Sequence, residues 1–306
     1  MAWGVGGSAA EAHRGGSEPF EGSEGDDTAR PFVANRWGNE ILSEPVVDMA
    51  IVTFTTDFGF SDGYVGAMKG VVLSMAPEAR LVDITHGIAP QDVAAGAIAL
   101  AQAAPLFPRG TIHVAVVDPG VGGARADVVV ASGGSFFIGP DNGVLALAAP
   151  EPRQVYRIDA TSFRREPVSP TFHGRDVFSP TAGRLASGAS PADAGPPLPS
   201  LVELDPPLVR QVGDRVEGRV THVDRFGNLL TSLAAELVWS GAQIEITGRD
   251  GTFRPAFGKT FADVAPGELV AYIGSSGLLE IGLRDGSAAL STGAGRGSPV
   301  RLRKGS

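Results

Sequence analysis

The sequence predicts an α/β protein: an N-terminal α/β domain with a central, mostly parallel sheet, followed by a C-terminal all-β domain of barrel-like form. In the first half of the chain, short apolar segments alternate with helical patterns, which is typical of a parallel sheet with helices on its faces. In the second half, strand patterns follow one another between turns without a convincing helix. The 42 Gly and 23 Pro residues favour short loops over long bundled helices.

Five segments of the first half have the composition of buried strands, because they are short and apolar on both faces. They are IVTFTT (51–56), RLVDIT (80–85), TIHVAVV (111–117), DVVVAS (127–132) and FFIG (136–139). Helical patterns lie between them at 64–76 and 92–107, and Asp92 is expected to be the N-cap of the second helix.

Composition divides the chain into four parts. Residues 1–48 carry nine acidic groups against three Arg and are rich in Gly and Ser, so a disordered acidic tail is expected there. The N-terminal α/β domain is expected at 49–190 and a Pro-rich linker at 191–212. The C-terminal β-barrel domain is expected at 213–306, with strands in RVEGRVTHVD, NLLTSL, QIEITG, LVAYIG, LLEIGL and PVRLR.

Charge and cysteine content narrow the class of partner. The net charge is −9, but the chain after residue 48 is nearly neutral and has no basic stripe, which argues against nucleic acid and against an anionic membrane surface. No signal peptide or membrane span is expected. The absence of cysteine excludes disulfides, thiol nucleophiles and thiolate metal sites, and the cytoplasm is the default location. A small-molecule ligand is favoured.

Polar residues follow three of the predicted strands. These residues are Asp57, Asp118 and the PDNG turn at 140–143. In open parallel sheets ligands bind beyond the carboxyl ends of the strands, so the three ends are expected to line one crevice. Asp or Asn beside Gly is also ordinary turn chemistry, and this structural interpretation is favoured for PDNG.

Two polar loops are candidates for one shared site. In VVDPGVGGAR, the Gly-rich segment between Asp118 and Arg125 allows both side chains to approach one point. In SPTFHGRDVFSP, His173 lies beside Gly174, whose lack of a side chain leaves room for a ligand. A lone histidine is more often structural, and Arg175 with Asp176 equally fits an ion pair that holds the loop. The other histidines of the folded part, His86, His113 and His222, are expected to be structural.

The sequence lacks the motifs that are typical of several classes of enzyme. Asp57, Asp83, His86 and Asp118 all lie at strand ends, but no H-x-x-x-H or H-x-E arrangement is present, so a catalytic metal is not expected. Neither a phosphate-binding G-x-x-x-x-G-K-[ST] loop nor the G-x-S-x-G turn of serine hydrolases occurs.

Seven motifs, in order, resemble the S-adenosyl-L-methionine (SAM) hydroxide adenosyltransferase family, the SAM hydrolases related to the fluorinase and chlorinase. They are TTDFGFSDGYVGAMKG, LVDITHGIAPQDV, GTIHVAVVDPGVGGAR, PDNG, TFHGRDVFSP, DRFGNLLTSL and GSSGLLEIGL. The resemblance covers residues 49–303 in both domains. It implies a homotrimer in which SAM binds between the N-terminal domain of one subunit and the C-terminal domain of the next.

The resemblance also implies roles for particular residues. The family's catalytic Asp, Arg and His correspond to Asp118, Arg125 and His173. Asp57 would accept hydrogen bonds from the ribose hydroxyls, Asp224 and Asn228 would bind the amino-acid end of SAM, and Phe226 would pack on the adenine side. The full set of implied substrate-binding residues is Asp57, Asp62, Phe172, Asp224, Phe226, Asn228, Ser275 and Glu280.

The implied reaction is hydrolysis of SAM to adenosine and L-methionine, without a metal or another cofactor. The fluorinase has Tyr in place of Asp118 and Tyr-Ser in place of His173 and Gly174. A carboxylate in the nucleophile pocket repels an anion, so a SAM-dependent halogenase is disfavoured. A non-catalytic protein that binds SAM or a nucleoside is the alternative from another class.

Overall fold

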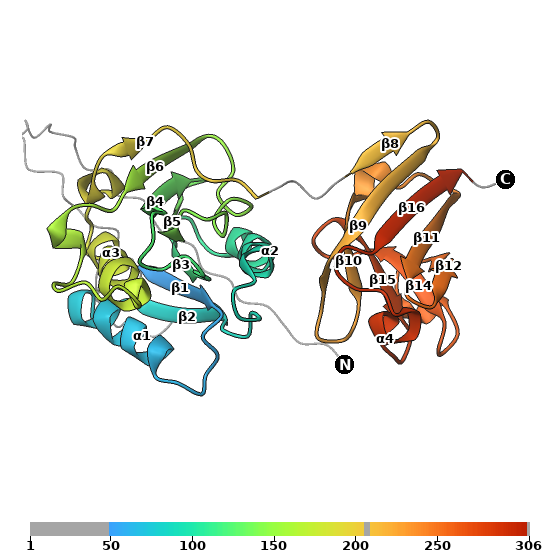
Figure 1. Ribbon diagram of the computed structural model, residues 1–306, viewed down its shortest axis with the longest axis horizontal. Helices are drawn as coiled ribbons and strands as arrows, with labels where there is room; N and C mark the ends of the chain where they lie inside the picture. Colours follow the sequence, from blue (N-terminus) through green and yellow to red (C-terminus); the bar gives the residue numbers. More distant parts are fainter. Residues whose placement is uncertain (1–48, 205–208, 305–306) are drawn as a thin grey trace, which may run out of the picture. The chain divides into compact units, whose positions relative to one another are not determined.

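The computed structural model describes residues 49–204 and 209–304 (Figure 1). The disordered tail predicted at 1–48 lies outside the described residues. The N-terminal sheet has seven strands in the order β2-β1-β3-β5-β4-β6-β7. Their bounds are β1 (Ile51–Thr56), β2 (Arg80–Thr85), β3 (Ile112–Val116), β4 (Asp127–Ser132), β5 (Ser135–Pro140), β6 (Arg153–Arg157) and β7 (Pro197–Leu198).

Four neighbouring strands of this sheet, β2, β1, β3 and β5, run parallel, as predicted. Strand β4 is antiparallel to both β5 and β6, and β7 is antiparallel to β6. The β4–β5 reversal follows from the two-glycine turn Gly133–Gly134, where both residues have positive φ, because a turn this short joins only antiparallel strands. The sheet is therefore mixed, with its parallel half at the β2 side.

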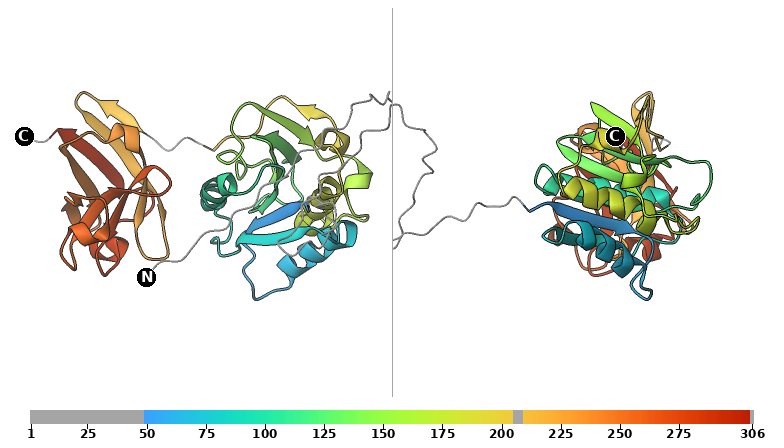
Figure 2. Two further views of the ribbon diagram at one scale, coloured as in Figure 1. Left: turned by 180° about the vertical axis from the view of Figure 1, so that it is seen from behind. Right: turned by 90° about the vertical axis from the view of Figure 1, so that its left-hand side faces the viewer.

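Helices cover both faces of the N-terminal sheet (Figures 1 and 2). They are α1 (Tyr64–Met75), α2 (Val93–Ala103) and α3 (Ser179–Ala186). Alternate residues of each strand point to opposite faces. On β3, Val114 packs in the core under α1 and α3, whereas Ala115 packs in the core under α2. The two cores explain why the strands are apolar on both faces.

Helix α2 begins as the sequence predicts. The Asp92 side chain accepts a hydrogen bond from Ala95 N at 3.1 Å, which is the expected N-cap contact. The α-helix ends at Ala103, four residues before the predicted end, and continues as a 3₁₀ turn over Ala104–Leu106. Pro105 has no N–H to extend the α-helical hydrogen-bond ladder, so the helix changes form there.

Part of the predicted linker packs on the N-terminal domain. A 3₁₀ turn at Pro191–Ala194 is capped by Ser190, β7 pairs with β6, and Leu201 is buried in the core under α2. Val202 N donates to the carboxylate of Asp141 at 2.7 Å. The ordered chain of this domain therefore extends beyond residue 190, because its prolines occupy an edge strand and a turn, where no backbone N–H is required. The other predicted boundaries stay predictions.

The C-terminal domain is a nine-stranded sheet curled into a half-barrel (Figure 2). The strand order is β12-β11-β16-β9-β10-β15-β14-β13, and β8 also pairs with β9. The bounds are β8 (Arg210–Val212), β9 (Arg215–Val223), β10 (Leu229–Ala234), β11 (Ala242–Gly248), β12 (Gly251–Phe253), β13 (Ala256–Phe257), β14 (Leu269–Ile273), β15 (Leu278–Leu283) and β16 (Pro299–Lys304). Alternate residues such as Val220, Leu229 and Ile281 fill its concave core.

Short helical segments complete the fold. Helix α4 (Ala288–Thr292) has Ser287 as its N-cap, and at five residues it is too short to give the periodicity by which helices are predicted. The others are 3₁₀ turns at Thr161–Phe163, Ala235–Leu237 and Phe261–Asp263 and a π-helical turn at Gly174–Phe178. In the part of the chain that the structure describes, no helix is long and apolar enough to cross a membrane.

Candidate active site

A cavity of about 430 Å³ lies at the carboxyl ends of β1 and β3. Asp57 follows β1, Asp118 follows β3, and both line the cavity. Phe172 and His173 line it from the loop that precedes α3. The structure therefore brings the two polar loops singled out in the sequence to one cavity, at the edge of the sheet where ligands bind in open α/β folds.

Arg125 binds Asp118 through a forked contact. Its Nε donates to Oδ1 of Asp118 at 2.9 Å and to Oδ2 at 3.1 Å, and its Nη2 also donates to Oδ2. Both side chains are at least 90% buried. Burial alone would lower the pKa of Arg125, but the hydrogen bonds to Asp118 and the charges of Asp127 and Asp118 raise it. The guanidinium is therefore a fixed positive charge beside the cavity.

His173 joins this cluster together with Asp127, which was not predicted as a site residue. His173 Nδ1 lies 3.1 Å from Arg125 Nη2 and 3.1 Å from Asp127 Oδ1. Arg125 Nη1 donates to the same oxygen of Asp127. The signal in the sequence was a charged residue at the start of the otherwise apolar strand DVVVAS, two positions after Arg125. One guanidinium thus connects two carboxylates and an imidazole.

The loop that carries His173 is held by the buried carboxylate of Asp176. Arg175 Nε and Nη2 each donate to Asp176 at 2.7 Å, and Ser169 N donates at 3.0 Å. Burial would raise the pKa of Asp176, but these hydrogen bonds and the charges of Arg175 and Arg165 hold it below its usual value. The Arg175–Asp176 ion pair considered from the sequence is present, and it fixes the backbone on both sides of His173.

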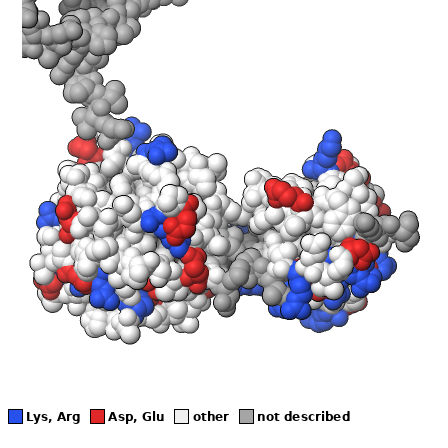
Figure 3. All heavy atoms as spheres, turned by 90° about the horizontal axis from the view of Figure 1, so that it is seen from above, with Lys and Arg blue, Asp and Glu red and all other residues white. Residues whose placement is uncertain are grey.

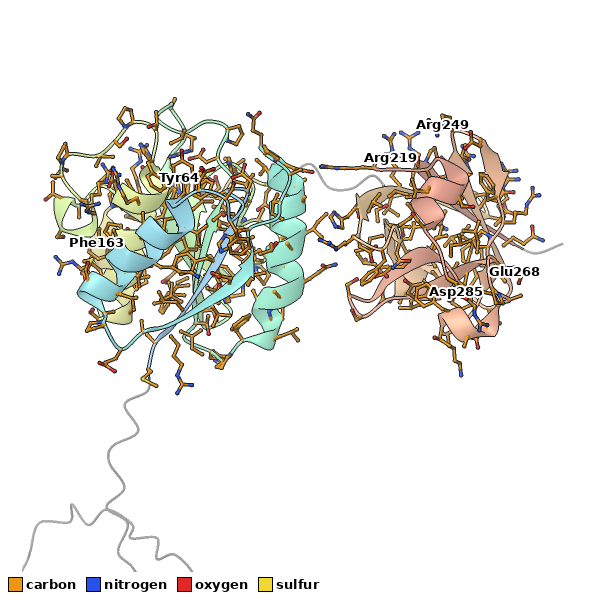
Figure 4. All side chains as sticks on the ribbon, turned by 90° about the horizontal axis from the view of Figure 1, so that it is seen from below. Tyr64, Phe163, Arg219, Arg249, Glu268 and Asp285 are labelled. Atoms are coloured by element: carbon orange, nitrogen blue, oxygen red, sulfur yellow. The ribbon has the colours of Figure 1, made fainter. Side chains whose placement is uncertain are left out.

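Three aromatic rings pack against one another beside Asp57. The ring centroids of Phe58 and Tyr64 are 5.8 Å apart, and those of Tyr64 and Phe172 are 5.2 Å apart. Tyr64, labelled at the first turn of α1 in Figure 4, was not predicted as a site residue. Asp57 Oδ2 accepts a hydrogen bond from Gln91 N at 2.8 Å. The candidate Asp62 is exposed and does not line the cavity.

The PDNG turn is structural, as predicted. Asn142 Nδ2 donates to Val117 O at 2.9 Å, and its Oδ1 accepts from Val144 N at 3.2 Å. The Asp141 carboxylate accepts from Val202 N, and burial raises its pKa. Neither residue lines the cavity. These contacts fix the turn after β5 and leave the cavity to the ends of β1 and β3.

Two histidines of the N-terminal domain are buried in structural contacts. Nδ1 of His86 forms a hydrogen bond with Thr56 Oγ1 at 2.8 Å, and its Nε2 lies 2.9 Å from Asp83 Oδ1. His113 bonds Thr53 Oγ1 at 2.8 Å and stacks on Phe137. Residues 49–204 and 209–304 contain no group of three or more His, Asp or Glu side chains placed to hold a metal ion. Metal independence stays a prediction.

The candidates of the C-terminal domain gather around the turn between β9 and β10. Asp224 Oδ1 accepts hydrogen bonds from Phe226 N at 2.9 Å and Asn228 N at 2.8 Å, and Oδ2 accepts from Asn228 Nδ2 at 2.8 Å. The Phe226 side chain is 76% exposed. The turn therefore presents an aromatic ring to solvent above a carboxylate that is already hydrogen-bonded.

Ser275 and Glu280 lie on the neighbouring hairpin of the half-barrel. Ser275 is exposed in the turn between β14 and β15, and Glu280 is half-buried on β15. Burial and the charge of Asp224 raise the pKa of Glu280, although a hydrogen bond with Tyr272 opposes the shift. Tyr272 was not predicted as a site residue. Asp224, Glu280 and Tyr272 form the polar cluster of this domain.

The chain has an α/β domain with a charged cluster beyond its parallel strands, followed by a β half-barrel with a polar cluster of its own. This combination is typical of a two-domain protein that binds a small molecule. The chain belongs to the SAM hydroxide adenosyltransferase family. The profile of the SAM hydroxide adenosyltransferase N-terminal domain matches residues 52–195, and that of the C-terminal domain matches residues 218–301. The resemblance seen in the motifs is thereby confirmed.

Similar proteins agree with this assignment. An (R)-S-adenosyl-L-methionine hydrolase from Salinispora tropica is 42% identical over 262 residues, which cover 83% of this chain and 98% of that protein. A fluorinase from Nocardia brasiliensis is more distant, at 29% identity over 83% of this chain and 97% of the fluorinase. The crystal structure of an uncharacterized conserved protein from Thermotoga maritima has a TM-score of 0.76 and 31% identity, covering 83% of this chain and all of that one.

Proposed function

We propose that this chain hydrolyses SAM to adenosine and L-methionine by in-line attack of a water molecule on C5′ of the ribose. The observation that carries the proposal is the meeting of Asp118, Arg125 and His173 beside one cavity, in a chain 42% identical to a SAM hydrolase. The substrate is a sulfonium, so C5′ is already electrophilic and methionine leaves without being protonated. The enzyme must supply a positioned nucleophile rather than a general acid.

Asp118 and His173 hold and polarise that water in the proposed mechanism. Both side chains line the cavity and offer acceptor atoms for its protons. Arg125 orients the Asp118 carboxylate through the forked contact and neutralises part of its charge. General-base assistance of this kind contributes about 10²- to 10⁴-fold to a rate.

Asp57 is the proposed partner of the ribose hydroxyls. One of its oxygens accepts a hydrogen bond from Gln91 N, which orients the carboxylate, and the other oxygen accepts none from the residues that the structure describes. Phe172 would pack against the sugar in the same cavity. In the C-terminal domain, Asp224 and Asn228 would bind the amino-acid end of SAM and Phe226 the adenine side, with Ser275 and Glu280 completing that wall. Asp62 is supported only by its position within the motif TTDFGFSDGYVGAMKG.

The proposed assembly follows from the same resemblance. We propose a homotrimer in which the N-terminal domain of one subunit and the C-terminal domain of the next enclose the substrate. The proposal of a cytoplasmic location rests on the sequence alone. On the face of the N-terminal domain shown in Figure 3, acidic and basic side chains are interspersed, so this face offers no basic stripe for nucleic acid.

The test is to incubate the full chain with SAM and to measure adenosine and methionine by chromatography. The two sulfonium epimers are tested separately, because the name of the Salinispora relative specifies the R form. Equal adenosine formation with and without a chelator supports the hydrolase. Binding of SAM without product supports the non-catalytic alternative, and loss of activity with chelator supports a metal-dependent hydrolase. Formation of 5′-chloro-5′-deoxyadenosine in high chloride would support a halogenase.

A further inference from the structure

We propose that Asp127 is a positioning residue for His173: it holds the imidazole in the tautomer protonated on Nδ1, so that Nε2 remains the acceptor available to the cavity. This inference rests on the proposed hydrolase function and adds a residue to it. Neither the motifs nor the implied catalytic set includes Asp127.

The fold places Asp127 at the site through the direction of β4. Because β4 is antiparallel to β5, its first residue lies at the edge where the parallel strands end. The backbone there is fixed: Asp127 O accepts from Ile158 N at 2.8 Å, and the residue lies opposite Pro140 in the ladder. A carboxylate on the first residue of a paired strand is held more firmly than one on a loop.

The contacts of Asp127 define what it can do to the imidazole. Its side chain is 9% exposed, and Oδ1 lies 3.1 Å from His173 Nδ1. An ionised carboxylate only accepts hydrogen bonds, so this contact is attractive only when Nδ1 carries a proton. In the neutral ring, a proton on Nδ1 leaves Nε2 as the acceptor, on the opposite edge of the ring.

Arg125 competes for the same ring nitrogen. Its Nη2 lies 3.1 Å from His173 Nδ1 and would favour an unprotonated Nδ1. However, each guanidinium nitrogen already donates one N–H to Asp118 or Asp127, and only the second N–H of Nη2 is left for His173. A proton on Nδ1 is attracted by the Asp127 carboxylate, and the two carboxylates around Arg125 outnumber the single guanidinium, so the local charges favour the Nδ1-protonated tautomer.

The consequence for the reaction is an oriented acceptor. A group that bonds one nitrogen of a functional histidine fixes both the tautomer and the direction of the ring. The ring of His173 also packs edge-on against Phe178, with centroids 6.5 Å apart. Asp127 and Phe178 together limit rotation of the imidazole, and Nε2 is then the nitrogen that can accept a proton from the attacking water.

The decisive variant is Asp127→Asn, which keeps the shape and removes the charge. Its amide can either accept from Nδ1–H or donate to an unprotonated Nδ1, so a single tautomer is no longer enforced. We expect kcat to fall about 10- to 100-fold, the range typical for loss of a group that orients a functional histidine, and KM to change little. Nitrogen-15 NMR of histidine-labelled protein should show Nδ1 protonated in the wild type and a mixed signal in the variant.

Asp83→Asn is the matched control. Asp83 also pairs with a histidine, His86, at 2.9 Å, and it does not line the cavity. This control should keep the wild-type kcat. A wild-type spectrum in which neutral His173 is protonated on Nε2 would overturn the inference. An Asp127→Asn protein with unchanged kcat and unchanged tautomer would overturn it too. So would a fall in kcat in Asp83→Asn equal to that in Asp127→Asn.

Two outcomes of these experiments distinguish failure of this inference from failure of the proposed function. If the wild-type protein forms no adenosine, the hydrolase proposal fails, while the NMR measurement still decides whether Asp127 sets the tautomer. If the wild-type protein forms adenosine and Asp127→Asn does so equally fast, only the positioning role fails. The wild-type spectrum also decides the question if Asp127→Asn does not fold.

Discussion

Gly122 lies directly against Pro170, and this contact joins the two loops of the cavity. Gly122 has φ +73°, and a Cβ at this position would lie within 3.0 Å of the carbonyl oxygen of Pro170. The first loop carries Asp118 and Arg125, and the second carries His173. The distance between the members of the charged cluster therefore depends on a position where only glycine fits.

Gly122→Ala should separate the two loops. The new methyl group meets backbone rather than a flexible side chain, so we expect kcat to fall at least about 10-fold, because small displacements of catalytic groups are costly. Gly133→Ala is the matched control, since Gly133 also has positive φ, +59°, but nothing lies within 4 Å of its added Cβ. Both should lose about 1 kcal/mol of unfolding free energy from the backbone alone. Equal activities in the two variants would contradict this account.

His173→Ala and Asp118→Ala should each lower kcat by about 10²- to 10⁴-fold, the contribution of general-base assistance. Binding of SAM, measured by calorimetry, should persist in both, because the proposed contacts to the ribose and to the amino-acid end come from other residues. Wild-type turnover in both variants would remove these residues from the mechanism. Loss of binding together with turnover would assign them to substrate binding instead.

Asp176→Asn should loosen the loop that carries His173. It removes the charge from a side chain that is 1% exposed and receives two hydrogen bonds from Arg175, so the unfolding free energy should fall by about 1–3 kcal/mol. Asp159→Asn is the control: Asp159 also lies near two Arg side chains but is 47% exposed, and exposed pairs contribute about 0–1 kcal/mol. Urea unfolding of the two variants measures the difference in unfolding free energy. We also expect kcat to fall in Asp176→Asn and to stay unchanged in Asp159→Asn.

The buried His113 should make the protein less stable as the pH falls from about 6.5 to about 4. Burial lowers the pKa of His113 from 6.5 to about 4, so within this range the unfolded chain binds a proton that the native protein does not. Stability therefore rises with pH through this window and is lost on acidification, by at most about 3 kcal/mol.

His113→Gln tests the assignment, because glutamine can still bond Thr53 and does not titrate. The difference in unfolding free energy between wild type and variant should shrink as the pH is lowered from 7 to 4. A difference that stays constant over this range would mean that His113 is not the group responsible.

Much of the N-terminal domain was predictable because its signals are local. The runs at 51–56, 80–85 and 127–132 are strands with the predicted bounds, and Asp92 caps the helix that follows it. The antiparallel strands were not predicted, since strand direction depends on the pairing partner and not on the composition of the strand. The ordered segment after residue 190 was also missed, because its prolines are equally typical of linkers and of edge strands.

For the site, the sequence by itself determined which residue types are available: two carboxylates after strands, an arginine seven positions after one of them, and a histidine in a distant loop. The order of the seven motifs along the chain indicated the protein family. Only the tertiary structure decided that Asp127 belongs to the cluster and that Asp62 does not line the cavity. Distances between side chains far apart in sequence are set by the direction of β4 and by the close contact of Gly122 with Pro170, and both depend on packing between segments that no local pattern encodes.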